Sequence, residues 1–193
     1  MRYFCQAVSV QLQAAVLIKA RQFADQVTPT VGTPGRGYLD SHQPNLAKIH
    51  QDHFVSKVGE EAVKTVFERL SQQVKGPDYK IYSRNQKSWL ADLQVEGVDL
   101  AVKTQRIESA YRFGLSWVFQ AGSERCDPIL SQPEAWVCFV MFDQTQSCCT
   151  VYPPYQIKEL QFDAPRLAHL RNSKRVVYAE RLPIVGLPIN PTS

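Results

Sequence analysis

The chain has 193 residues, of which 44% are apolar and 21% charged, with a formal net charge of +4. These values predict one soluble domain with a sizeable core. No apolar run reaches the roughly 18 residues of a membrane span, and polar residues interrupt the first apolar run, so neither a membrane partner nor a signal peptide is expected. Five cysteines without a CxxC pair exclude an evident zinc site or disulfide framework and favour a cytoplasmic protein.

Residues 1–44 are predicted to form an N-terminal helix and a loop. Apolar residues recur at three- and four-residue steps over residues 5–27, as in a helix with one buried face. The frequent Pro and Gly of residues 28–44 predict a loop. Arg36 lies there between two glycines and could approach a phosphate backbone. The alternative is a plain surface connection.

The core is expected over residues 45–182, and it opens with a helix over residues 45–70. Its apolar residues form one stripe, and Glu60 and Glu61 fall on opposite borders of that stripe. Either glutamate could lean toward a neighbouring site, but not both. The alternative is that both are solvated. His50 and His53 lie on the more polar side and are interpreted as surface residues.

A short strand is predicted at residues 79–82, and a polar, basic turn follows it. Arg84 and Lys87 lie in this turn and could contact DNA phosphate. Basic residues in a turn can also serve solubility alone, so both interpretations stay open.

Residues 89–105 alternate between apolar and other residues on both sides of Glu96-Gly97, which is typical of a hairpin. A two-residue loop places Val95 opposite Val98, Gln94 opposite Asp99 and Asp92 opposite Ala101. The period of two then places Asp99, Ala101, Lys103 and Gln105 on one face of the second strand.

The remaining elements follow from apolar runs and breakers. We expect a helix from residue 108, strands at 114–120, 136–142, 148–152 and 176–178, a short helix at 165–170 and an irregular tail at 183–193. The continuous apolar run 136–142 is typical of a central strand buried on both faces. Arg171, Lys174 and Arg175 lie in the densest basic stretch of the chain, which could bind DNA. Together these elements predict an α/β fold, an α/β/α sandwich with a mixed central sheet.

The hairpin resembles the metal-binding hairpin of the PD-(D/E)xK nuclease superfamily, the fold of most type II restriction endonucleases. Asp92 matches the Asp of that motif and Lys103 matches its Lys. Ala101 stands where the family has Glu or Asp, and Ala has no oxygen to bind a metal. Many members carry a further acid on the preceding helix, for which Glu60, directly after Gly59, is the match. Gln105 could touch water or phosphate, or simply face solvent.

This resemblance implies a restriction-endonuclease-like fold and Mg²⁺-dependent cleavage of double-stranded DNA. Asp92 and position 101 would hold the ion, and Lys103 would lie beside the attacking water. A palindromic target would imply a homodimer, and a restriction system would imply a cognate DNA methyltransferase. The alternatives are a non-cleaving DNA-binding or repair-associated relative and an unrelated α/β interaction protein.

Ala101 has three explanations. A carboxylate was replaced to stop cleavage, the site borrows Asp99 or a helix Glu instead, or the chain is a natural inactive DNA-binding relative. The sequence does not separate them.

Overall fold

A computed structural model describes residues 1–31, 45–82, 91–123 and 125–186. In this part of the chain the helices are α1 (Ala14–Val27), α2 (Leu46–Arg69) and α3 (Ile107–Phe113), with 3₁₀ turns η1 (Thr28–Thr30), η2 (Pro128–Ser131), η3 (Ile157–Glu159), η4 (Ala168–Leu170) and η5 (Ala179–Arg181). The strands are β1 (Val8–Gln11), β2 (Val74–Lys75), β3 (Leu93–Val95), β4 (Val98–Arg106), β5 (Ser116–Gln120), β6 (Trp136–Asp143), β7 (Cys148–Val151), β8 (Tyr155–Gln156) and β9 (Lys174–Tyr178).

Seven strands form a mixed sheet in the order β1-β7-β6-β4-β3-β2, and β8 pairs with the start of β6. β4 and β6 are parallel, whereas the other pairs are antiparallel. Parallel neighbours need a long crossover, and here α3, β5 and η2 lie between β4 and β6 in the chain. The protein is therefore a mixed α/β fold, as the sequence predicts.

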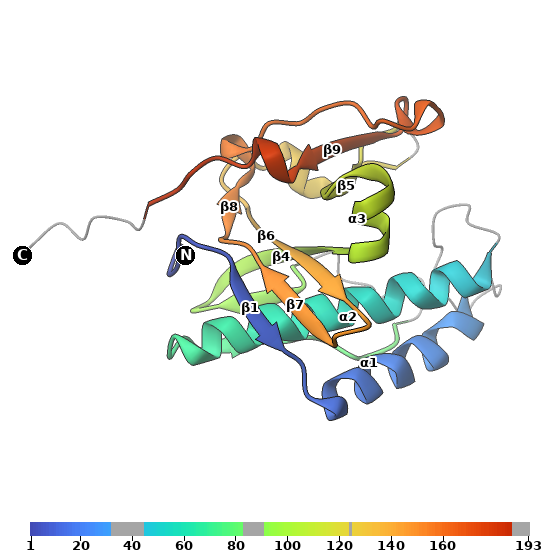
Figure 1. Ribbon diagram of the computed structural model, residues 1–193, viewed down its shortest axis with the longest axis vertical. Coiled ribbons are helices and arrows are strands. Elements are labelled where there is room, and N and C mark those ends of the chain that lie inside the picture. The colour runs from blue at the N-terminus through green and yellow to red at the C-terminus, as the bar shows by residue number, and fades with distance from the viewer. Residues whose placement is uncertain (32–44, 83–90, 124, 187–193) are drawn as a thin grey trace, which may run out of the picture.

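The two faces of the sheet have different covers. Figure 1 shows α1 and α2 on one side of the sheet and, on the other, α3 with the two-stranded ribbon β5–β9. Both faces of the sheet are therefore covered, but β-ribbon as well as helix covers the second face, which differs from the helical layer of the predicted α/β/α sandwich. None of the helices in the described ranges is both long and apolar enough to cross a membrane.

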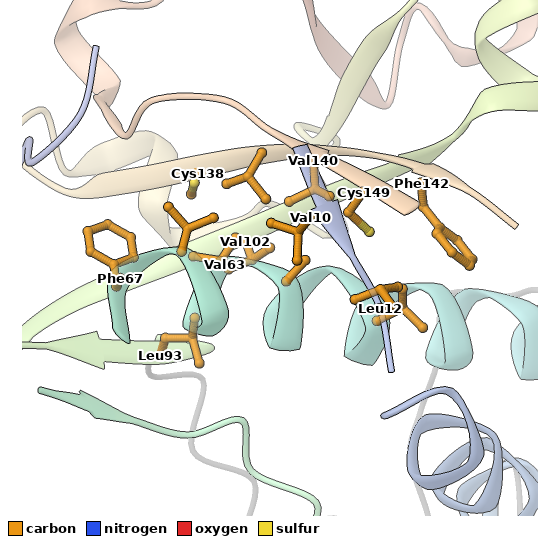
Figure 2. Packing of buried hydrophobic residues seen from close by; sticks show 14 of the residues in the cluster. Val10, Leu12, Val63, Phe67, Leu93, Val102, Cys138, Val140, Phe142 and Cys149 are labelled. Carbon is orange, nitrogen blue, oxygen red and sulfur yellow. The ribbon is translucent and has the colours of Figure 1, made fainter. Parts of the chain in front are cut away.

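The main core lies between α2 and the sheet, where Val63 and Phe67 of the helix belong to the same buried cluster as Val102 and Val140 of the strands (Figure 2). A second core lies under the ribbon and includes Trp117. β6 supplies side chains to both cores alternately, which confirms the central, doubly buried strand predicted for residues 136–142.

The predicted hairpin is present with the predicted register. Val95 pairs with Val98 and Gln94 with Asp99 across a two-residue turn. Glu96 and Gly97 both have positive φ, 49° and 77°, as a type I′ turn requires. The backbone N–H of Gln73 donates to the Glu96 carboxylate over 2.6 Å, which stabilises this turn although its first residue is not Gly or Asn.

α2 lies unusually close to β4. Asn45 caps the helix by accepting a hydrogen bond from the Lys48 N–H. Halfway along, Gly59 faces Thr104 so closely that a Cβ on residue 59 would lie 1.8 Å from the Thr104 Oγ1. Only glycine allows this approach, and it brings the next residue, Glu60, against the sheet.

Three sequence predictions are wrong in detail. Residues 8–11, predicted as helix, form strand β1, because they pair with β7. Residues 79–82, predicted as a strand, are irregular, and the nearby strand is β2 at Val74–Lys75. Residues 165–170, predicted as a helix, hold only the 3₁₀ turn η4. The predicted tail is irregular over residues 183–186, and the rest of it lies outside the described ranges.

Candidate active site

A cavity of about 530 Å³ lies where the end of the β3–β4 hairpin meets α2 and the loop before η2. Glu60, Asp92, Ala101 and Lys103 all line it, so the four residues singled out from the sequence meet at one place. Asp99 also lines the cavity. Its described lining holds six Asp or Glu and four Lys or Arg side chains, so the acids outnumber the bases by two.

Glu60 is the most buried acid of the cavity, only 1% exposed. Its carboxylate accepts hydrogen bonds from the Ser56 hydroxyl over 2.9 Å and from the Lys57 ammonium over 2.6 Å. Burial, and second the negative charge of Asp92, raise the pKa of Glu60 to about 7, against the opposing effect of Lys57. At neutral pH the site therefore holds a carboxyl group that a further positive charge would ionise fully.

Glu60 and Glu61 play different parts, as their places on the stripe predict, but neither is solvated. Glu61 is buried, does not line the cavity, and accepts a hydrogen bond from the Tyr79 hydroxyl over 2.9 Å. The Lys19 ammonium lies 3.5 Å from the same carboxylate. Glu61 therefore ties α1 and residue 79 to α2.

Asp92 stands just before β3, where the hairpin ladder ends. Its Oδ2 accepts a hydrogen bond from the Val102 backbone N–H over 2.7 Å, so the side chain replaces a ladder partner and fixes its own position beside β4. Ala101, the neighbour of Val102, turns its methyl group to the opposite face of the strand from Leu100 and Val102.

Lys103 reaches the cavity from the same face of β4 as Ala101. Its Nζ lies 2.7 Å from Asp127 Oδ2 and 4.8 Å from the centre of the Phe119 ring. Asp127 follows β5, and its Oδ2 also accepts the Gln120 backbone N–H over 3.1 Å. The ammonium of Lys103 is thus held at the cavity wall by an acid that comes from the crossover between β4 and β6.

The fit of a magnesium ion depends on two carboxylates. No group of three or more His, Cys, Asp or Glu side chains within the described ranges is placed to hold a metal. Glu60 and Asp92 are close enough for the charge of one to raise the pKa of the other. Mg²⁺ is commonly bound through one or two carboxylates, with waters and substrate phosphates completing its shell. The residues present therefore fit a weak magnesium site that a substrate would complete.

The other predicted contacts are spread over the molecule. Arg36, Arg84 and Lys87 lie outside the described residues. Gln105 lines a second cavity of about 310 Å³, and its amide group binds the backbone of Gly114 and Ser116. Its predicted contact with phosphate stays a prediction.

The basic stretch of residues 171–175 lies around the start of β9. Arg171 donates to the Pro165 carbonyl, Lys174 bonds to the Gln120 side chain, and Arg175 is exposed. None of the three lines the cavity. A role in DNA binding at a distance from the site stays a prediction.

Several charged residues of the cavity lining were missed by sequence reasoning, and two of them, Lys57 and Asp127, pair directly with Glu60 and Lys103. Lys57 is one of several lysines on α2, and only its i,i+3 spacing to Glu60 could have identified it as a partner of that glutamate. Asp127 has no signal near the hairpin, because it follows Lys103 by 24 positions. His53, interpreted as a surface residue, lines the cavity and packs edge-on against Phe23.

In comparisons with known proteins, no family model, no curated protein and no solved structure matches the chain.

Proposed function

We propose that this chain is a PD-(D/E)xK-like DNA nuclease domain, with a restriction-endonuclease-like core, and that its Ala101 form cleaves DNA very poorly. One observation carries the proposal. A single cavity is lined by Glu60 of α2 and by Asp92, Ala101 and Lys103 of the hairpin. Along the chain these residues match the residue types of the family motif, except at position 101. Fold likeness alone would not support an activity.

The side chains of the cavity have separate roles in this proposal. Glu60 and Asp92 would hold Mg²⁺, which, when bound, neutralises phosphate charge and lowers the pKa of a water. Lys103, oriented by Asp127, stabilises the charge that develops on the phosphate. Ala101 leaves the wall of the cavity without the carboxylate that would fix the ion's position.

The test is to restore the missing acid. The Ala101→Glu variant should cut duplex DNA in Mg²⁺ at least about 100-fold faster than the unmodified chain, the order of effect seen when one group of a catalytic centre is added or removed. Ala101→Gln is the matched control, because it has the same shape without the charge. Lys103→Met in the Ala101→Glu background should abolish the gain.

Two results would contradict the proposal. Efficient cleavage by the unmodified chain would show that position 101 is not the missing ligand. Equal, negligible cleavage by the Ala101→Glu and Ala101→Gln variants would remove the nuclease assignment itself.

A second candidate is a non-cleaving DNA-binding relative, and Ala101 together with the Lys57–Glu60 ion pair favours it. Both candidates require salt-dependent binding to duplex DNA, because Lys and Arg release counterions from the phosphates. Replacing Arg171, Lys174 and Arg175 together should weaken binding and lower the salt slope by about 3, at 0.9 per phosphate contact. Replacing the paired surface lysines Lys48, Lys64 and Lys158 is the control.

Unchanged DNA affinity after the triple replacement would mean that this basic stretch serves solubility alone. The homodimer belongs to the same proposal, since a twofold target calls for a twofold protein. So does a cognate DNA methyltransferase, which a neighbouring gene would encode. Both remain proposals that depend on the nuclease assignment.

A further inference from the structure

Lys57 already places a positive charge inside the acidic part of the cavity. Its Nζ lies 2.6 Å from Glu60 Oε2, and the two side chains are only 13% and 2% exposed. The ammonium also lies 5.2 Å from the centre of the Phe23 ring and 5.6 Å from that of Tyr79, within the range of cation–π attraction. The Lys57 ammonium is therefore fixed in place by several contacts, unlike that of an ordinary surface lysine.

This charge occupies an oxygen that a metal ion would need. Glu60 is one of the two carboxylates that fit a magnesium ion, and its two oxygens bind Ser56 and Lys57. Asp92, the other carboxylate, repels Glu60, and Lys57 offsets that repulsion. A divalent cation that binds Glu60 must therefore remove the Lys57 ammonium from Oε2 or share that oxygen with it at the cost of like-charge repulsion.

We propose that Lys57 is a built-in competitor of the divalent cation and sets the affinity of the Glu60–Asp92 pair for metal. The inference rests on the proposed function in using the same two carboxylates, but it concerns cation binding and not cleavage. Once displaced, the ammonium keeps Phe23, Tyr79 and the charge of Asp78 around it, so the exchange leaves no isolated charge. A phosphate that supplies ligands to the metal would drive the exchange.

The test measures Mn²⁺ binding to the whole chain by calorimetry at pH 8, without DNA. Lys57→Met keeps the apolar stem and removes the charge. We expect it to bind Mn²⁺ about tenfold or more tightly than the unmodified chain, because a unit charge in direct contact with a ligand oxygen repels a divalent ion strongly. Lys57→Gln, whose amide can still donate to Glu60, is the second variant should Lys57→Met fold poorly.

Two controls make the result specific. Lys64→Met removes the same charge from the same helix, beside Glu68 and outside the cavity, and should leave Mn²⁺ affinity unchanged. Glu60→Gln in the Lys57→Met background should abolish the gain.

Equal Mn²⁺ affinity of Lys57→Met and the unmodified chain, or no binding by Lys57→Met or Lys57→Gln, would overturn the inference. Its failure is distinguishable from failure of the proposed function. Tighter Mn²⁺ binding without cleavage by Ala101→Glu would keep the inference and remove the nuclease assignment. Cleavage by Ala101→Glu with unchanged Mn²⁺ affinity of the Lys57 variants would do the reverse.

Discussion

Two ion pairs line the cavity, one from α2 and one from β4 and the loop after β5, and they are almost equally short. Lys57–Glu60 measures 2.6 Å on the α2 side, and Lys103–Asp127 measures 2.7 Å on the side of β5. Their exposure differs, since the Glu60 side chain is 2% exposed whereas the Lys103 side chain is 27% exposed. Equal distances therefore do not mean equal energies, because burial decides how strongly water screens each pair.

The difference in burial gives the Lys57–Glu60 and Lys103–Asp127 pairs different roles. Removing one partner of a buried ion pair is costly, because the other charge is then buried without a partner. We call the side of the cavity that holds Lys57 and Glu60 the α2 wall, and we expect the stability of the protein to be sensitive to substitutions there. A partly exposed pair contributes little to stability, so the β5 wall, which holds Lys103 and Asp127, can release Lys103 to a substrate phosphate at small cost. Three substitutions test this difference, from the largest expected effect to the smallest.

The first substitution is Glu60→Gln, followed by unfolding in EDTA at several pH values. The pKa of Glu60 is about 7 in the folded chain against an ordinary 4.5, so its contribution to stability is fully present below pH 4.5 and is lost as the pH rises through 7. At 1.36 kcal/mol per unit the loss amounts to about 3 kcal/mol. Glu60→Gln should remove this pH dependence.

Glu68→Gln is the control, because Glu68 lies on the same helix with its side chain 51% exposed. Identical pH profiles for the unmodified chain and Glu60→Gln would show that burial of the Glu60 charge does not make the α2 side the more sensitive of the two.

Gly59→Ala tests the close contact that places Glu60. The added Cβ would lie 1.8 Å from Thr104 Oγ1, so helix and strand must move apart. Overpacking costs about 1–3 kcal/mol, and the better helix propensity of Ala returns about 1 kcal/mol at most. We expect a net loss of about 1–2 kcal/mol in urea unfolding. The loss should shrink in a Thr104→Gly background, and an undiminished loss there would assign the cost to another contact.

Asp127→Asn should have the smallest effect. The new side chain keeps an oxygen for the Gln120 N–H and loses only the charge that faces Lys103. We expect a loss below about 1 kcal/mol, and a smaller one in high salt. A loss of several kcal/mol, independent of salt, would show that the two walls do not differ.

Local patterns were sufficient for the parts of the site that lie close together in the chain. The hairpin register followed from Glu96-Gly97 and from the alternation of apolar and other residues around it. Both ends of α2 lie within one residue of the predicted range 45–70. The sequence therefore predicted that Asp92, Ala101 and Lys103 lie close together, because a two-residue turn leaves few choices of register.

Contacts between distant segments could not be predicted in this way. Residues 8–11 follow the apolar steps of a helix, yet they also alternate as Val8, Ser9, Val10 and Gln11, and β7 decides between the two by pairing with them. Asp127 reaches Lys103 only because the crossover returns over the sheet. Propensity carries no information about such partners.

The pairing of β1 with β7 has a consequence for the order of folding. Val8 pairs with Val151 and Gln11 with Cys148, so the ribosome must release the chain beyond residue 151 before this edge of the sheet can close. The hairpin and α2 can form much earlier, whereas β4 gains its parallel neighbour only once β6 has been synthesised. Contacts at such separation slow folding, and until they form, β6 presents an unpaired apolar strand to other chains. Chaperone binding to nascent chains should therefore rise once β6 has been synthesised and fall when β4 and β6 have paired.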